Sequence, residues 1–417
     1  MSLYDNAAVL VALVAALGYF NHRVLKLPTT IGLVVIALVS SLVVLGIDLL
    51  SPSWHLREML AGYVTDIDFN KTLMYGMLSF LLFAGALHTD LNTLLERRYT
   101  VALLATGGVF LSTFLVGTAA WLILPLIGLD LPYVVCLVFG ALISPTDPIA
   151  VLGMLKRAGA PPRLSAIIAG ESLFNDGVGV VLFIVLATVA GLSGGHEAPG
   201  AVTVAVLFAG EVGGGVVLGL VLGIVAYHAL KSIDEHILEV QITLALVMLA
   251  TVVSDKLHVS GPIAVVLAGL LLGNHGKRFA MSENTIDHMQ KFWDMLDEIL
   301  NAVLFLLIGL EVFAVSLSPM NLLAGAILVP VVLAARTVSV AIPVTIMGLW
   351  RSFDRGTVPI LVWSGLRGGI SVALVLSLPP FAGKDSLVTA VYVIVLFSIL
   401  AQGLTVKPLV SRLLSRS

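Results

Sequence analysis

Long apolar blocks with almost no charge are the feature that most restricts the fold of this chain. Of its 417 residues, 59% are hydrophobic and 11% are charged, against about 45–50% and about 25% in an ordinary soluble domain. Many blocks approach the length of about 20 residues that a helix needs to cross hydrocarbon. The pattern predicts an all-α polytopic membrane protein and excludes a soluble enzyme. A net charge of −3 and the lack of a basic tract give no sign of nucleic-acid binding.

Thirteen apolar segments result when the chain is divided at clusters of polar residues, proline and glycine. They cover residues 6–21, 28–48, 72–88, 100–128, 131–154, 164–191, 201–229, 237–255, 259–273, 293–313, 320–349, 356–378 and 386–406. The first has no basic residue before it and no small-residue cleavage site after it, which favours a retained helix over a signal peptide. Two elements are expected between segments: an external interfacial helix or an ordinary connection at 51–70, and a short amphipathic helix at 91–96.

The basic residues indicate how the segments are oriented. Sixteen of the 22 lie in the loops after odd-numbered segments or in the tail, and four lie in the loops after even-numbered segments. Because cytoplasmic loops collect lysine and arginine, we expect thirteen crossings with the N-terminus outside and the C-terminus in the cytoplasm. From the short tail after residue 406 we expect no cytoplasmic regulatory domain.

The odd number of segments permits two inverted six-helix repeats. They would cover 1–191 and 237–417, with the glycine-rich segment 201–229 as a linker helix. Segments 5 and 12, seven apart, are both interrupted, by Ser-Pro-Thr-Asp-Pro at 144–148 and by Gly-Leu-Arg-Gly-Gly at 365–369. Breaks at matching positions of two halves are the best pointer to the binding site of a transporter.

Asp147 is an acid at membrane depth, where a charge is costly and is a functional hypothesis by default. Pro145 and Pro148 flank it, and each lacks an N–H group and frees a backbone carbonyl. A carboxylate, the hydroxyl of Thr146 and freed carbonyls form the hard-oxygen environment that suits a hard cation. The alternative is a proline kink in which Asp147 has only a structural partner.

A second polar cluster, Gly-Glu-Ser-Leu-Phe-Asn-Asp-Gly at 170–177, lies within the sixth segment. In a helix, Ser172 and Asp176 share one face, and Glu171 and Asn175 share the neighbouring face. Because segments 5 and 6 are adjacent, the aspartate of the break can face Asp176. Two such carboxylates attract a cation, and competition between a proton and a metal ion for them is sufficient for exchange.

Two arginines lie inside apolar segments. Arg336 is mid-way along segment 11 with no acid on its own segment, and an unpaired arginine there is costly. Glu171 is its natural partner; the alternative is that Arg336 faces a water-filled vestibule. Arg367 lies in the break of segment 12, where its charge can compensate the C-terminal carbonyls of a helix. We expect this structural role rather than contact with a substrate.

Weaker candidates lie near segment ends. Glu211 and Glu239 are expected to line a vestibule or a subunit interface. Asp294, Asp297 and Glu298 begin segment 10. We expect them to form either a hydrated helix end or a funnel that attracts cations. The histidines at segment ends, interpreted as interfacial, are His88, His228, His258 and His275.

The complete pattern resembles the cation/proton antiporter-1 family, the bacterial NhaP-type and animal sodium/proton exchangers. The resemblance covers essentially the whole chain and is carried by the thirteen segments, the motifs at 144–148, 170–176 and 365–369, and the lone Arg336. It implies the NhaA/NhaP-like antiporter fold with crossing broken helices 5 and 12. It also implies a homodimer, in which a mobile core of segments 4–6 and 11–13 moves against a dimerisation domain made of the remainder.

The resemblance implies roles for individual residues as well. The ligands of the transported Na+ would be Asp176, Asp147, Thr146 and Ser172. Asp176 would be the essential transport carboxylate, Asn175 would stabilise the broken helix, and Glu171 would pair with Arg336. The order Asn-Asp at 175–176 matches the electroneutral members of the family, whereas electrogenic relatives have Asp-Asp. The chain lacks the long cytoplasmic tail that many relatives carry.

We therefore expect electroneutral exchange of one Na+ or Li+ for one H+ by alternating access, in the inner or plasma membrane, without a cofactor. Potassium/proton exchange is the alternative choice of cation. A cation channel is disfavoured because a permanent deep site slows flux. An intramembrane aspartyl protease that uses Asp147 and Asp176 for acid–base chemistry is disfavoured because an acid between two prolines, with hydroxyls nearby, suits cation ligation better.

Overall fold

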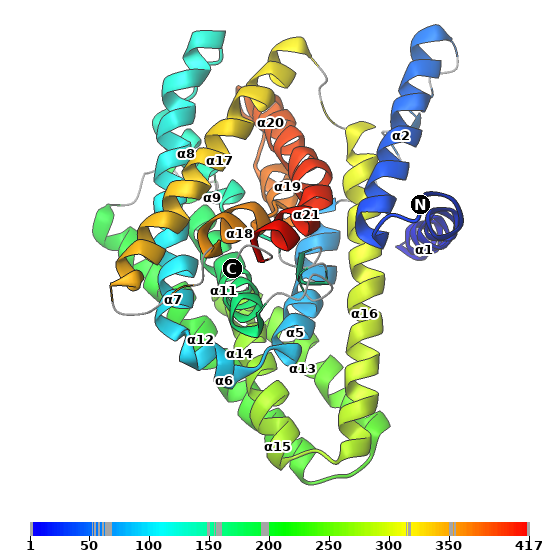
Figure 1. The fold of residues 1–417 in the computed structure, drawn as a ribbon, viewed down its shortest axis with the longest axis vertical. Helices are drawn as coiled ribbons and strands as arrows, with labels where there is room; N and C mark the ends of the chain where they lie inside the picture. Colours follow the sequence, from blue (N-terminus) through cyan, green and yellow to red (C-terminus); the bar gives the residue numbers. More distant parts are fainter. Residues whose placement is uncertain are drawn as a thin grey trace.

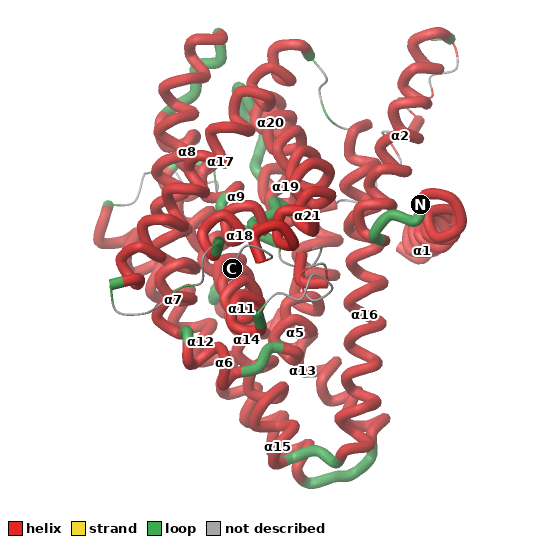
Figure 2. The backbone as a smooth tube through the Cα atoms, in the orientation of Figure 1, coloured by secondary structure: helices red, strands yellow, loops and turns green. Residues whose placement is uncertain are grey.

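The chain is helical almost throughout in the computed structural model (Figures 1 and 2). The structure describes residues 3–51, 53, 56, 59–60, 62, 69–147, 151–153, 155, 161–192, 200–313, 315, 318–349, 353 and 356–414. Within these ranges there is no named strand, and one isolated antiparallel bridge is formed. The expected all-α class is confirmed.

The elements follow the apolar segments of the sequence. The α-helices are α1 Leu3–Phe20, α2 Thr29–Leu50, α4 Phe69–Lys71, α5 Leu78–His88, α6 Leu91–Glu96, α7 Arg98–Leu103, α8 Val109–Ile123, α9 Tyr133–Ile143, α11 Pro162–Val189, α12 Ala201–Lys231, α13 His236–Leu257, α14 Gly261–Leu271, α15 Lys277–Phe279, α16 Glu283–Leu310, α17 Pro319–Gly348, α18 Thr357–Ser364, α19 Gly369–Ser377, α20 Lys384–Phe397 and α21 Gly403–Leu414. The π-helical turns are η1 Asn21–Leu25, η3 Thr72–Met77, η4 Leu104–Gly108, η6 Leu272–Gly276 and η8 Ser398–Gln402, and the 3₁₀ turns are η5 Leu124–Ile127 and η7 Glu311–Phe313.

Eight continuous helical stretches in the described part of the chain are long and apolar enough to cross a membrane. Two shorter apolar stretches, 72–88 and 133–143, correspond to predicted segments 3 and 5. The polytopic class therefore agrees with the sequence, while the number of thirteen crossings and their orientation stay predictions. The expected short helix at 91–96 is present as α6. The stretch 51–70 lies largely outside the described residues.

Helix α16 begins ten residues earlier than the sequence segment 293–313 predicts. Its first turns are capped by Ser282, whose side chain accepts a hydrogen bond from the amide of Thr285 (3.3 Å). These turns are rich in charged residues, so a boundary drawn by hydrophobicity excludes them although they continue the same helix. Asp294, Asp297 and Glu298 consequently lie inside α16 rather than at its start, so the helix end expected there is wrong, while the alternative of a cation-attracting funnel is not contradicted.

The two broken segments meet at the centre of the molecule (Figure 1). Segment 5 leaves its helix after Ile143, and segment 12 is divided into α18 and α19. The amide of Asp147 donates a hydrogen bond to the carbonyl of Leu366 (2.8 Å), which forms the isolated bridge between the two breaks. Gly368 permits this approach, because a Cβ atom there would lie 2.7 Å from Oδ2 of Asp147. The crossing of two broken helices expected from the sequence is thus present.

The helices pack in two groups, one around α9 and α17 and the other around α14 and α16. α9 contacts α8 and α11, and α17 contacts α8, α18 and α20. α14 contacts α5 and α12, whereas α16 contacts mainly α2, α5 and α13. Helix α16 extends along one side of the molecule together with α2 (Figure 1). The two groups leave a hollow between them, and Thr146, Asp147, Ser172 and Asp176 of the sequence motifs lie on its wall.

Candidate functional site

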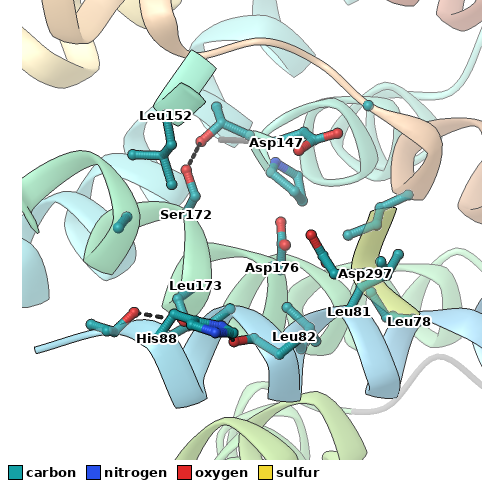
Figure 3. A pocket seen from close by; sticks show the side chains of 18 of the residues that line it. Leu78, Leu81, Leu82, His88, Asp147, Leu152, Ser172, Leu173, Asp176 and Asp297 are labelled. Carbon is teal, nitrogen blue, oxygen red and sulfur yellow. Dashed lines mark hydrogen bonds between the residues drawn. The ribbon is translucent and has the colours of Figure 1, made fainter. Parts of the chain in front are cut away.

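A cavity of about 760 Å³ lies between the two helix groups (Figure 3). Its walls come from α5, the start of α6, the break after α9, α11, α16 and α19. Leucines form much of the lining, and five aspartates also contribute: Asp90, Asp147, Asp176, Asp294 and Asp297. Carboxylates in a mostly apolar hollow are poorly hydrated, so a cation that enters gains strong electrostatic attraction.

Asp176 lies on the wall of this cavity in the middle of α11. The residue is only 5% exposed, and its Oδ1 atom has no hydrogen-bond partner among the described residues. Asp147, on the neighbouring break, lies within electrostatic range of Asp176. A buried carboxylate oxygen without a partner is costly, and a cation or a proton removes that cost.

Hydroxyl groups accompany the two carboxylates. The Oγ1 atom of Thr146 lies 3.1 Å from Oγ of Ser172, and both residues line the cavity. The amide nitrogen of Asn175 donates to Oγ1 of Thr146 (2.8 Å), and the backbone amide of Thr146 donates to Oδ1 of Asn175 (3.4 Å). Asn175 therefore fixes the irregular backbone of the break to α11 and orients the threonine hydroxyl.

Glu171 and Arg336 form a buried ion pair. Both guanidinium NH groups donate to the carboxylate of Glu171, and the Nη2–Oε2 distance is 3.1 Å. The side chains are 2% and 8% exposed, so Arg336 does not face a water-filled vestibule. Arg336 also donates to the carbonyl of Leu361 at the end of α18 (3.1 Å). The pair ties α11 to α17 and leaves Asp147 and Asp176 as the carboxylates that line the cavity at the crossing.

Arg367 lies at the crossing of the broken helices. Its guanidinium donates to the carbonyls of Ser144 and Pro145, with a distance of 3.0 Å to the latter, and its backbone amide donates to Ser398 (2.8 Å). Arg367 thereby satisfies carbonyls that the end of α9 leaves without helical partners. It is not among the residues that line the cavity.

The weaker candidates are distributed differently. Asp294 and His88 line the mouth of the cavity, and Nε2 of His88 lies 3.1 Å from Oδ1 of Asp294. Asp297 lies deeper, beside Asp176 in Figure 3, whereas Glu298 does not line the cavity. Glu239 is fully buried at the start of α13 and accepts a hydrogen bond from Thr285 (3.1 Å), away from the cavity lining.

Four further residues have places that the sequence left open. Glu211 lies in α12, and its backbone carbonyl accepts a hydrogen bond from Ser260 (3.0 Å). His258 caps the C-terminus of α13 in the left-handed conformation (φ 52°). His228 and His275 lie in the last turns of their helices. None of these residues lines the cavity.

Two buried polar residues of the tenth segment were missed by the sequence interpretation. Asn301 is 2% exposed and lies one turn after Asp297, with whose carboxylate its side chain interacts. Glu311, 4% exposed, follows the last turn of α16. The signal was available, because each interrupts an apolar run in the same manner as Arg336. No group of three or more histidines, cysteines or acids in the described chain is arranged to hold a resident metal ion.

Comparison with known proteins identifies the family. Residues 9–412 match the family model described as "Sodium/hydrogen exchanger, transmembrane". The chain is 46% identical to the Na(+)/H(+) antiporter NhaP of Pseudomonas aeruginosa over 415 residues, which are 99% of this chain and 97% of that protein. It is 37% identical to the Na(+)/H(+) antiporter NhaH of Halobacillus dabanensis, with 94% of this chain and 93% of that protein covered.

A solved structure has the same fold. The sodium proton antiporter MjNhaP1 from Methanocaldococcus jannaschii superimposes with a TM-score of 0.77 over 99% of this chain and 100% of that one, at 20% identity. The chain therefore belongs to the sodium/hydrogen exchanger family of transmembrane exchangers, and it has the antiporter fold that the sequence motifs predicted.

Proposed function

We propose that the protein exchanges one Na+ (or Li+) for one H+ across a cell membrane. The observation that carries the proposal is the buried Oδ1 of Asp176, which has no partner in the described chain and lies on the cavity wall. The named function of the relatives, Na(+)/H(+) antiport, supports the same ions. Asp176 is the group that holds either ion, and Asp147, Thr146 and Ser172 supply further oxygen atoms to the cation.

The charges at the crossing support one-for-one exchange. Three acids, Asp147, Glu171 and Asp176, lie with two arginines, Arg336 and Arg367. With all five ionised this group carries one net negative charge, and a single Na+ or a single proton neutralises it. Moving a net charge through hydrocarbon is costly, so the loaded group crosses more easily than the empty one. This difference prevents leak of either ion.

The movement itself is assigned to a core of segments 4–6 and 11–13. The ion pair between α11 and α17, and the bridge between the two breaks, join elements within this group. The remaining segments, with α12 as the linker helix between two inverted repeats, form the dimerisation domain of a homodimer in the plasma or inner membrane. The N-terminus lies outside and the C-terminus in the cytoplasm, as the distribution of basic residues favours.

The proposal is tested by replacing the essential carboxylate. In everted membrane vesicles with a pH-reporting dye, Asp176→Asn abolishes proton flux driven by Na+, because the amide cannot exchange a proton for a cation. Asp234→Asn, in the exposed connection between α12 and α13, retains normal exchange and serves as the control. Full activity of Asp176→Asn contradicts the assignment.

The stoichiometry has its own measurement. If exchange is electroneutral, a membrane potential set with valinomycin and K+ leaves the equilibrium Na+ gradient unchanged. A gradient that follows the potential contradicts one-for-one exchange. Initial rates with Na+, Li+ and K+ at several pH values then separate sodium exchange from the alternative of potassium exchange.

Other classes are distinguished in the same vesicles. A channel conducts the cation without moving a proton in the opposite direction. An intramembrane aspartyl protease cleaves peptides and shows no proton flux on addition of Na+. Proton flux that depends on the cation, without peptidase activity, supports the antiporter over both.

A further inference from the structure

Asp297 is a third carboxylate at the inner part of the cavity that the proposed exchange does not use. It lines the cavity with Asp147 and Asp176, and Figure 3 shows the side chains of all three at the same cavity. Asp297 lies within electrostatic range of Asp147, Asp294 and Glu298, and the side chain of Asn301, one turn later on α16, interacts with its carboxylate. Its side chain is partly accessible from the cavity, so a hydrated cation that enters can approach it.

The charge of Asp297 has no basic counterpart in the described part of the chain. Asp294, one turn earlier on α16, lies 3.1 Å from His88, and Glu171 is paired with Arg336. No ion pair of Asp297 is present among the described residues. An independent feature of the same cavity points to a ligand: Oδ1 of the 5% exposed Asp176 is without a partner there. The wall on each side of this space thus offers carboxylate oxygen to a cation.

The two carboxylates come from different parts of the fold. Asp176 belongs to α11, within segments 4–6. Asp297 belongs to α16, which is segment 10 and packs mainly against α2, α5 and α13. When the core moves, Asp176 moves with it, and Asp297 remains with the helices that stay in place.

The mouth of the cavity indicates the side of the membrane to which the space opens. The lining residues at this end include the exposed His88 and Asp90, which lie with Thr93 in the connection that contains Arg97 and Arg98. Basic residues mark cytoplasmic connections, so this space faces the cytoplasm. A cation held between the core and α16 is therefore one taken up from, or released to, the cytoplasm.

We propose that Asp297 is a side-specific ligand for the monovalent cation: it binds Na+ or Li+ together with the core carboxylates while the cavity faces the cytoplasm, and it does not follow the ion across the membrane. The inference rests on the proposed exchange of Na+ for H+ and on the proposed core. The consequence is that the affinity for the cation differs between the two faces of the membrane. It is higher at the cytoplasmic face, where Asp297 adds its carboxylate to the ligands that the core supplies.

The test compares the two faces of one variant. Na+-driven proton flux is measured for Asp297→Asn in everted vesicles, which expose the cytoplasmic face, and in right-side-out vesicles. We expect the KM for Na+ to rise about three- to tenfold at the cytoplasmic face, since one carboxylate beside a cation in a partly hydrated cavity contributes on this scale. The KM at the opposite face stays unchanged, and kcat changes by less than about twofold.

Two further variants control for folding and for general surface charge. Asp297→Glu keeps the carboxylate and restores most of the cytoplasmic affinity. Asp287→Asn removes a carboxylate from the exposed face of the same helix, where Asp287 pairs with Lys291 (2.6 Å), and leaves the KM at both faces unchanged.

The possible outcomes separate the two proposals. An unchanged cytoplasmic KM in Asp297→Asn overturns the inference, and so does an equal rise at both faces, which indicates a structural role or a ligand that moves with the core. If the wild-type protein itself shows no exchange of Na+ for H+, the proposed function fails instead.

Discussion

The buried pair of Glu171 and Arg336 allows a quantitative prediction for Glu171→Gln. The substitution keeps the shape of the side chain and removes its charge, so Arg336 remains charged in an apolar interior with a side-chain exposure of 8%. Breaking a buried ion pair from one side costs about 3–5 kcal/mol. The carbonyl of Leu361 still accepts from Arg336 (3.1 Å), and the glutamine oxygen can accept one bond. We therefore expect a loss of about 3 kcal/mol, the low end of that range.

The double variant Glu171→Gln/Arg336→Met makes the reasoning specific. Neither side chain is charged in it, so no uncompensated charge is left in the interior, and it is more stable than either single variant. The free energy of unfolding is measured for all four proteins in mixed micelles with an increasing fraction of sodium dodecyl sulfate. The coupling energy of the resulting double-mutant cycle is expected to be about 2–3 kcal/mol in favour of the pair.

Two results refute this account of the pair. The first is a cost below about 1 kcal/mol for Glu171→Gln, the range of an exposed ion pair. The second is a double variant destabilised by the sum of the two single effects, which would show that the residues act independently.

Three further predictions concern the break and its surroundings. Asn175→Ala removes the amide that donates to the hydroxyl of Thr146 (2.8 Å). We expect the KM for Na+ to rise about tenfold, the equivalent of one lost hydrogen bond. An unchanged KM in vesicles contradicts this positioning role. Gly368→Val adds a side chain at the crossing, where a Cβ atom would lie 2.7 Å from Oδ2 of Asp147. We expect the free energy of unfolding, measured in the same micelles, to fall by about 1–3 kcal/mol. Exchange, measured in the same vesicles, is reduced. Asp90→Ala removes the N-cap of α6, at a cost of about 1 kcal/mol at pH 7. The pKa of Asp90 is lowered from 3.8, chiefly by the side-chain hydrogen bond from Thr93; its stabilisation is therefore present above that value and is lost as the pH falls through the folded-state pKa. Hydrogen exchange of the α6 amides should differ between variant and wild type at pH 7 and converge in acid, and a difference that does not depend on pH contradicts the reasoning.

The sequence predicted the parts of the site that depend on charge at membrane depth. Arg336 has no acid on its own segment, and an unpaired arginine in the interior is costly, so Glu171 was the expected partner. The two breaks were visible because proline and glycine interrupt apolar runs. The resemblance of the motifs to a known family then gave the fold, which the structural comparison supports.

The remaining features depend on long-range geometry or on a boundary that hydrophobicity does not define. The bridge joins Asp147 to Leu366, and no local pattern specifies the register of two chain segments so far apart. Helix α16 continues through its charged first turns, so the position of Asp297 in the interior of a helix, rather than at its end, followed only from the three-dimensional structure. The roles of the site residues in transport stay predictions that the variants above test.

The single bridge at the crossing has a consequence for how the protein responds to ions of different radius. The amide of Asp147 holds the carbonyl of Leu366 (2.8 Å), and the side chain of the same residue is a proposed ligand. In the proposed site, a larger ion that pushes this side chain outward also pulls on the backbone of the second break, which is joined to the first by this hydrogen bond and by the guanidinium of Arg367. We therefore expect an ion of unsuitable radius to be disfavoured by strain at the junction of α18 and α19 as well as by its own coordination.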